Sequence, residues 1–118
     1  MSRRLQRLNV LLRQEISDLI RRELRDPRLS EIVTLTRVST SPDLGAATAY
    51  VSIMGSEDEK GATMDALTHA APFIRRRLTA RLTIRRVPEI EFALDETMEE
   101  AAHVLDLLKH LPGTDPDT

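Results

Sequence analysis

Arginine is the residue whose spacing in this sequence most suggests chemistry. The stretch FIRRRLTARLTIRRV contains six arginines and no acidic residue. A guanidinium group binds phosphate through planar, bidentate contacts, so a polyanion is the partner that such a segment would recognise. When the segment is taken alone, a solvated arginine face explains it equally well. The six candidates are Arg75, Arg76, Arg77, Arg81, Arg85 and Arg86.

Helical spacing would place some of these charges side by side. Arg77 and Arg81 are four residues apart and share one helix face, which Arg85 continues if the helix persists. Like charges at this spacing are mildly destabilising, which favours an anionic partner. The start of the chain adds three less specific candidates, Arg3, Arg4 and Arg7.

Catalytic and metal-binding patterns are weak. Glu99 and His103 are four residues apart and could share a metal, but no third ligand has a compelling position, and a solvated helix face explains the pair better. The chain has no cysteine, which excludes disulfides, thiolate zinc sites and cysteine nucleophiles. We therefore predict a protein that is not an enzyme, with no catalytic residues, no metal and no cofactor.

Length and charge point to one domain with segregated charge. The chain has 118 residues and a net charge of −2, yet its acids gather at positions 57–59, at 89–100 and in the tail. Local potential governs polyanion binding, so an acidic protein can still bind RNA through a basic face. No apolar run is long enough to span a membrane, and we expect a cytoplasmic protein.

The elements that must position these residues follow from periodicity. Apolar residues recur at helical spacing from Leu5 to Leu24, ahead of the terminating segment RDPR. IVTLTRVST (32–40) and ATAYVSIM (47–54) predict an antiparallel hairpin across the turn SPDLG. Ser56 and Glu59 form a capping-box pattern that opens the next helical region.

Proline divides that helical region. Pro72 interrupts the apolar pattern, which predicts two helices joined by a kink at Ala70, Ala71 and Pro72. EIEFALD (89–95) predicts a third strand, and Thr97 with Glu100 predicts the cap of a last amphipathic helix. The result is one α+β domain over residues 1–110, ordered α-β-β-α(kink)α-β plus a C-terminal helix. Helices should cover one face of a three-stranded sheet, and residues 111–118 form a disordered acidic tail.

Taken together, these segments resemble a known family. The resemblance runs from Leu5 to Leu108 and rests on RRELRDPRL, TRVSTSPDLGAATAYVSI and FIRRRLTARLTIRRVPEIEFALDET. The chain resembles ribosome-binding factor A, a family of small bacterial proteins with a type II KH-like fold. The resemblance implies a non-catalytic factor that binds the immature small (30S) ribosomal subunit and its 16S rRNA, and we expect it to act as a monomer. It also implies roles in late maturation, in processing of the rRNA 5′ end and in cold adaptation, with an assembly GTPase helping release.

The kink is where this chain departs from the family. Ordinary KH domains clamp the nucleic-acid backbone with a Gly-x-x-Gly loop, and this family instead carries Ala-x-Gly. The corresponding residues here are Ala70, Ala71 and Pro72, so proline replaces the glycine and removes a backbone N–H donor. The arginines must then carry more of any RNA contact. The alternative function is a KH-like protein–protein interaction module whose basic face binds an acidic partner.

Overall fold

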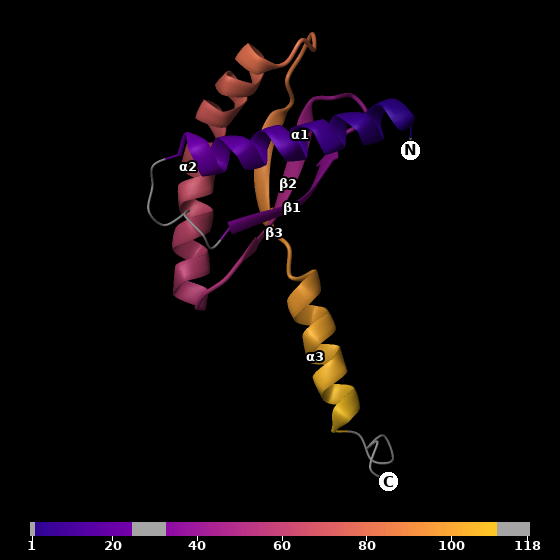
Figure 1. The fold of residues 1–118 in the computed structure, drawn as a ribbon, viewed down its shortest axis with the longest axis vertical. Helices are drawn as coiled ribbons and strands as arrows, with labels where there is room; N and C mark the ends of the chain where they lie inside the picture. The colour runs from indigo at the N-terminus through magenta and orange to yellow at the C-terminus, as the bar shows by residue number, and fades with distance from the viewer. Residues whose placement is uncertain (1, 25–32, 111–118) are drawn as a thin grey trace.

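The residues that the structure describes form three helices and three strands in the computed structural model (Figure 1). The structure describes residues 2–24 and 33–110, apart from the side chains of residues 98–102. The tail predicted at 111–118 lies outside these residues, as does the RDPR segment. The elements are α1 (Arg3–Arg22), β1 (Val33–Thr40), β2 (Ala46–Ile53), α2 (Glu57–Arg81), β3 (Glu89–Leu94) and α3 (Thr97–Lys109). Their order confirms the predicted α+β class.

The sheet is mixed and has β2 at its centre. β1 and β2 form the predicted antiparallel hairpin, with a bulge between Leu35 and Arg37. β3 pairs with β2 in parallel, from Ala46 opposite Glu89 to Val51 opposite Leu94. Parallel neighbours need a crossover, and α2 supplies it.

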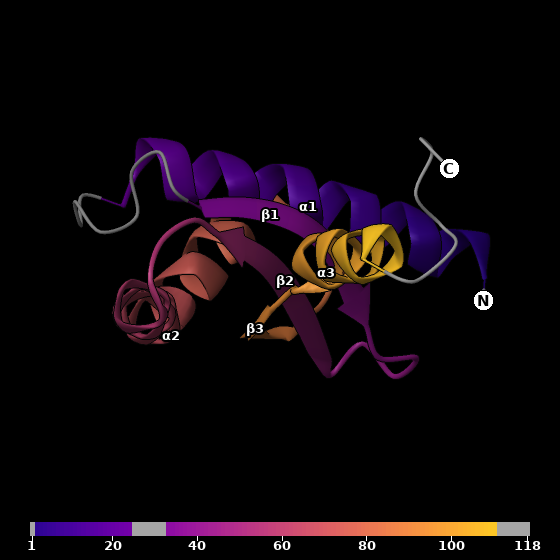
Figure 2. The same ribbon diagram turned by 90° about the horizontal axis from the view of Figure 1, so that it is seen from below.

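An aliphatic core lies between the sheet and the first two helices. Every second residue of β2 is buried, as its alternating pattern predicts. α1 packs against β1 and α2 packs against β3 (Figure 2). Phe73 and Phe92 are only partly buried. The largest fully buried side chains include Leu12, Ile16, Leu19, Val51, Leu67, Ile74 and Leu78.

The start of α2 is capped as its sequence predicts. The Ser56 hydroxyl accepts a hydrogen bond from the Glu59 amide at 3.2 Å, and the Glu59 carboxylate accepts one from the Ser56 amide at 3.2 Å. Gly55 precedes this box with a φ of 137°, and a Cβ there would lie 2.9 Å from Glu59 Oε2. A glycine is therefore required where β2 turns into α2.

The helical region around Pro72 is one helix rather than two. α2 runs without a break from Glu57 to Arg81 with Pro72 inside it, although its axis changes direction between the lower and upper halves (Figure 1). Proline cannot donate to the carbonyl of Thr68, so a single intrahelical hydrogen bond is lost. Leu67 and Ile74, on either side of the proline, are both completely buried. This packing holds the bent helix together.

α3 differs from the prediction in its cap and in its packing. Glu96 is the N-cap and makes no side-chain capping bond, so the predicted Thr97–Glu100 cap is wrong. Instead, the Asp95 carboxylate accepts a hydrogen bond from the Thr97 amide at 2.9 Å. α3 extends beyond the end of the sheet and is seen nearly end-on in Figure 2 (Figures 1 and 2). Its apolar residues Val104, Leu105, Leu107 and Leu108 are exposed.

Candidate nucleic-acid interface

Arg77 and Arg81 share a face of α2, and that face meets carboxylates of α1. Arg77 donates two hydrogen bonds to Glu23, at 2.8 Å from Nε and 2.7 Å from Nη2. Arg81 Nη1 contacts Glu15 at 3.1 Å and Asp18 at 3.0 Å, and Arg81 Nη2 lies 3.4 Å from Glu23. The two arginines therefore join the C-terminal half of α2 to α1.

Electrostatics keeps this cluster ionised. The hydrogen bond from Arg77 lowers the pKa of Glu23, and the one from Arg81 lowers the pKa of Asp18. The same contacts raise the pKa of both arginines. Arg22 also lies 2.7 Å from Asp18, so three cations face three carboxylates and the cluster presents no surplus positive charge to a phosphate. These ion pairs tie α2 to α1, and RNA binding by Arg77 and Arg81 stays a prediction.

Arg75 is also engaged. Its Nε and Nη2 donate to the carbonyl of Val87 at 3.2 Å and 3.0 Å, and its side chain is partly buried. This contact ties α2 to the segment that leads into β3.

The remaining three arginines of the segment are exposed. Arg76, Arg85 and Arg86 form no hydrogen bond or ion pair with another residue in the described part of the chain. Arg86 lies within electrostatic reach of Asp43 in the β1–β2 turn. The pKa of Asp43 is lowered first by the Ser41 hydroxyl, then by the Gly45 amide, with a smaller effect from Arg86.

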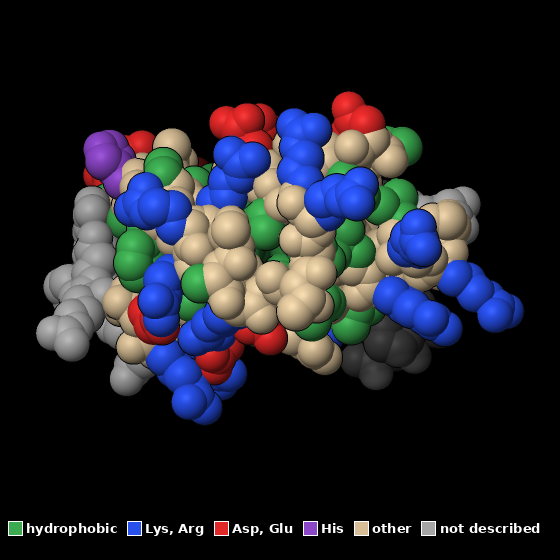
Figure 3. Space-filling view, turned by 90° about the horizontal axis from the view of Figure 1, so that it is seen from above, with side chains coloured by type: hydrophobic (Ala, Val, Ile, Leu, Met, Phe, Trp, Pro, Cys, Tyr) green, Lys and Arg blue, Asp and Glu red, His purple; other side chains and the backbone are tan. Residues whose placement is uncertain are grey.

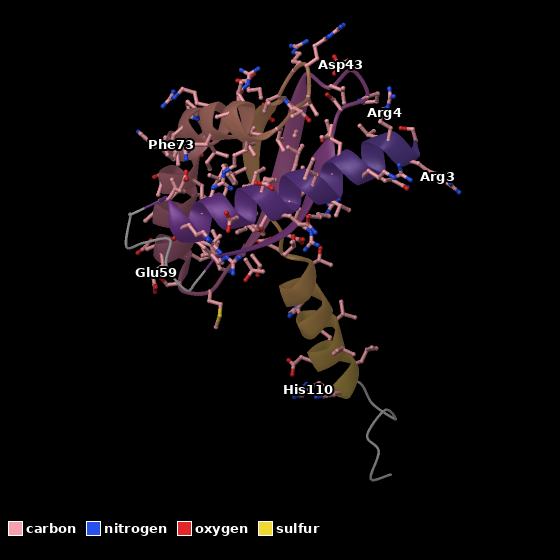
Figure 4. All side chains as sticks on the ribbon, turned by 45° about the horizontal axis from the view of Figure 1, so that its top comes forward. Arg3, Arg4, Asp43, Glu59, Phe73 and His110 are labelled. Atoms are coloured by element: carbon pink, nitrogen blue, oxygen red, sulfur yellow. The ribbon has the colours of Figure 1, made fainter. Side chains whose placement is uncertain are left out.

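The N-terminal arginines are brought to the same end of the molecule. Arg3, Arg4 and Arg7 are exposed on the first two turns of α1. Figure 4 places Arg3 and Arg4 at this helix end and Asp43 at the neighbouring hairpin turn. Figure 3 views this end from above and shows basic side chains spread across it. Six of the arginines that the sequence predicts to bind RNA are called the exposed arginines below: Arg3, Arg4, Arg7, Arg76, Arg85 and Arg86.

A groove lies beside the bend of α2, between that helix and β3. Its volume is about 660 Å³, and Ala71, Pro72 and Arg76 line its helical wall. Glu89 and Glu91 line the strand wall and are exposed. Of the three predicted kink residues, Ala70 does not line the groove and packs against the core instead.

The chemistry of this kink groove does not suit a phosphate clamp. Pro72 has no N–H to donate, and it leaves the carbonyl of Thr68, which also lines the groove, without its usual helical partner. Glu89 and Glu91 offset the charges of Arg75 and Arg76. The missing amide and the two carboxylates therefore make the groove a poor site for a phosphate.

The described side chains do not form a metal-binding cluster. Within the part of the chain that the structure describes, no group of three or more histidine, aspartate or glutamate side chains could hold a metal. The side chain of Glu99, and with it the predicted pairing with His103, lies outside the described part of the structure. None of the described helices is long and apolar enough to cross a membrane.

The acidic partners of Arg77 and Arg81 were missed from the sequence. Glu15, Asp18 and Glu23 are spaced three and five residues apart, which places all three on one side of α1. Such a stripe, opposite an arginine pair on another helix, is the signal that could have identified the cluster. Nothing in the sequence shows that α1 and α2 are neighbours.

Comparison with known proteins gives consistent results. The family model described as ribosome-binding factor A matches residues 4–108. The Thermomicrobium roseum protein named ribosome-binding factor A is 49% identical to this chain over 105 residues. The match covers 89% of this chain and 81% of the relative. The Dictyoglomus thermophilum relative is 46% identical, covering 94% of this chain and 92% of its own.

Solved structures show the same likeness. The solution structure of a Thermotoga maritima protein, described as a ribosome binding factor A, superposes with a TM-score of 0.70 at 32% identity. That match covers 79% of this chain and 88% of the other. A homology model of Thermus thermophilus ribosome binding factor A, as fitted into a cryo-EM map of a 30S complex, superposes with a TM-score of 0.61 at 25% identity. That match covers 75% of this chain and 91% of the other.

Proposed function

Because the chain belongs to the ribosome-binding factor A family, we propose that it binds the immature small ribosomal subunit and its 16S rRNA. The Thermus thermophilus relative that has been fitted into a 30S complex supports this partner. In this proposal the protein is a non-catalytic, monomeric assembly factor that acts in the cytoplasm. It assists late maturation and processing of the 16S rRNA 5′ end, and an assembly GTPase promotes its release.

The observation that carries the proposal is the difference among the arginines. Arg77 and Arg81 are neutralised by α1, and Arg75 is tied to Val87. Arg85 and Arg86, which follow α2, lack such partners among the described residues. Together with the other exposed arginines they form a surface that can exchange bound counterions for rRNA phosphates.

Co-sedimentation with small subunits tests this assignment. We expect the double variant Arg85→Gln, Arg86→Gln to lose most of its subunit binding at moderate salt. The matched control Arg13→Gln, Arg21→Gln removes the same charge from exposed positions of α1 and should keep its binding. Equal losses in the two variants would mean that only total charge matters, and the assignment of the RNA surface would fail.

A second candidate is favoured by one observation. The exposed apolar residues of α3 are typical of a surface that meets another protein, as a KH-like protein–protein interaction module requires. Binding to purified 16S rRNA, free of ribosomal proteins, separates the two functions. Binding to that RNA supports the first function, whereas binding only to protein-containing particles supports the second.

A further inference from the structure

A second groove lies where the β1–β2 turn meets the start of α1, at the end of the hairpin that is away from α2. It has a volume of about 790 Å³, within the usual range for small-molecule sites of about 300 to 1,000 Å³. Arg4, Leu5 and Leu8 form its helical wall, and Thr40, Pro42 and Leu44 form its wall at the β1–β2 turn. It shares no lining residue with the kink groove.

The N-terminus of α1 makes one end of this groove electropositive. The Ser2 hydroxyl accepts from the Leu5 amide at 3.1 Å, and the Ser2 carbonyl accepts from the Gln6 amide at 3.1 Å. The amides of Arg3 and Arg4, by helix geometry, point out of the helix end. The first turn holds arginines and no acid, so nothing on α1 offsets the positive end of the helix dipole.

Thr40 provides an independent sign of a ligand. Its side chain is only 4% exposed, and its hydroxyl has no hydrogen-bond partner among the described residues. The Thr40 amide is satisfied by Asn9 Oδ1 at 2.9 Å, so the unmet group is the hydroxyl alone. Buried polar groups are nearly always hydrogen-bonded, and Thr40 lines the groove.

The turn supplies an apolar wall. Leu44 has a φ of 62°, a left-handed conformation that leucine rarely adopts. With Leu5, Leu8 and Pro42 it gives the groove a largely apolar lining. Asp43 is the neighbouring carboxylate, and it is hydrogen-bonded to the Ser41 hydroxyl and the Gly45 amide at 2.7 Å and 2.9 Å.

We propose that this groove binds one unpaired nucleotide of an RNA strand. The phosphate sits at the exposed amides of α1 with Arg4, where the helix dipole favours an anion. The base lies against Leu5, Leu8 and Leu44, and the Thr40 hydroxyl bonds to a polar group of the nucleotide. The apolar wall and the size of the groove favour a nucleotide over a phosphorylated serine. The proposal rests on the RNA-binding function above and names a second contact for it.

Titration of the full chain with uridine monophosphate, followed by amide NMR shifts, tests the proposal. We expect shifts at residues 3–8 and 40–44, with weaker binding of inorganic phosphate and of uridine. Thr40→Val keeps the shape of the side chain and removes the hydroxyl. It should weaken uridine monophosphate binding about three- to tenfold. Its thermal midpoint without ligand should be unchanged or higher, because the unsatisfied buried group is gone.

A matched control and a subunit assay make the outcome decisive. Thr34→Val changes an exposed threonine of the same strand and should leave nucleotide affinity unchanged. The proposal is overturned if Thr40→Val leaves affinity unchanged, or if inorganic phosphate or phosphoserine binds as tightly as the nucleotide. Subunit co-sedimentation is measured on the same wild-type preparation. If the protein binds subunits but shows no nucleotide shifts, the nucleotide site is rejected and the proposed function stands. If it shows nucleotide shifts but does not bind subunits, the nucleotide site stands and the proposed function is rejected.

Discussion

At Arg81, one guanidinium group contacts Glu15 and Asp18 and lies 3.4 Å from Glu23. Its side chain and those of its partners are each between 23% and 30% exposed, so water screens the cluster only in part. Without Arg81, Asp18 would keep only its ion pair with Arg22, Glu23 only that with Arg77, and Glu15 would have none among the described residues. Arg81 therefore stabilises the fold through the bonds that it makes and by keeping these carboxylates paired.

The first prediction follows from this cluster. Arg81→Gln should lower the midpoint of unfolding in urea and leave the urea dependence of the free energy unchanged. Arg85→Gln is the matched control, since Arg85 is exposed and has no ion-pair partner among the described residues; its midpoint should equal that of the wild type. Equal midpoints for both variants would show that the ion pairs contribute nothing.

Asp95 gives the second prediction. Its carboxylate accepts a 2.6 Å hydrogen bond from the Thr36 hydroxyl, and this contact, followed by those of Thr97, lowers its pKa from 3.8 to about 2. The unfolded chain then binds the proton more tightly than the folded one. The stabilisation is full above pH 3.8 and is lost as the pH falls toward about 2. Thr36→Val should raise the pKa of Asp95, which carboxyl ¹³C NMR would measure. An unmoved titration would exclude Thr36 as the main cause.

Among the elements, α2 combines a bend with continuous packing. Pro72 is exposed and lines the kink groove, whereas Ile74 and Leu78 are completely buried against the sheet. The bend thus leaves the core intact and alters only the groove surface. The two sides of the helix can therefore be varied independently.

The third prediction uses this separation. Pro72→Gly and Pro72→Ala both restore an amide donor toward Thr68, but only glycine permits close backbone approach. We expect the alanine variant to be more stable than the glycine variant by about 1 kcal/mol, from helix propensity. Subunit binding of the glycine variant should hold or improve. A clear drop in its affinity at unchanged stability would contradict the view that proline limits backbone contact here.

The described apolar side chains of α3 lie outside the core. Leu105 is 59% exposed, whereas Leu78 is 0% exposed. The fourth prediction is that Leu105→Gln changes the free energy of unfolding by less than about 0.5 kcal/mol. Leu78→Ala should lower it by about 2–5 kcal/mol. Denaturant titration of both variants makes the comparison, and a loss above about 1.5 kcal/mol for Leu105→Gln would mean that α3 packs against the domain.

Over the whole molecule, the charged residues differ in whether they form ion pairs as well as in where they lie. The net charge is only −2, but three acids of α1 are occupied by Arg77 and Arg81. Figure 3 shows lysine and arginine side chains spread across the face of the molecule that is seen from above. A polyanion can therefore approach this face without overcoming the average charge of the protein.

The fifth prediction concerns salt. If all six exposed arginines meet phosphates, the logarithm of affinity for 16S rRNA should fall with that of salt with a slope of about −4 to −5. Arg85→Gln with Arg86→Gln should make the slope shallower by about 1.5. Arg77→Gln with Arg81→Gln should lower the unfolding midpoint and leave the slope nearly unchanged. If instead the Arg77 and Arg81 variant has the shallower slope, the face of α2 that meets α1 contacts the phosphates.

Local sequence determined the elements of this protein because their signals act over a few residues. Burial of every second residue in β2 and the Ser56–Glu59 capping box follow from periods and spacings of at most four residues. The same local patterns predicted the order of the elements and the α+β class, and the family resemblance added the type II KH-like fold. Pro72 was recognised as a bend, but not as a bend within one helix, because the packing of its flanking residues is a long-range effect.

Only the tertiary structure decided which arginines are available. Arg77 and Arg85 look alike in sequence, yet Arg77 meets Glu23, which is 54 residues away along the chain. The groove at Thr40 likewise joins the first turn of α1 to a hairpin more than thirty residues later. The Arg4 charge, the Thr40 hydroxyl and the apolar side chains of the groove can act together only when folding brings them within a few ångströms. Hydrogen bonds and ion pairs act only at such distances.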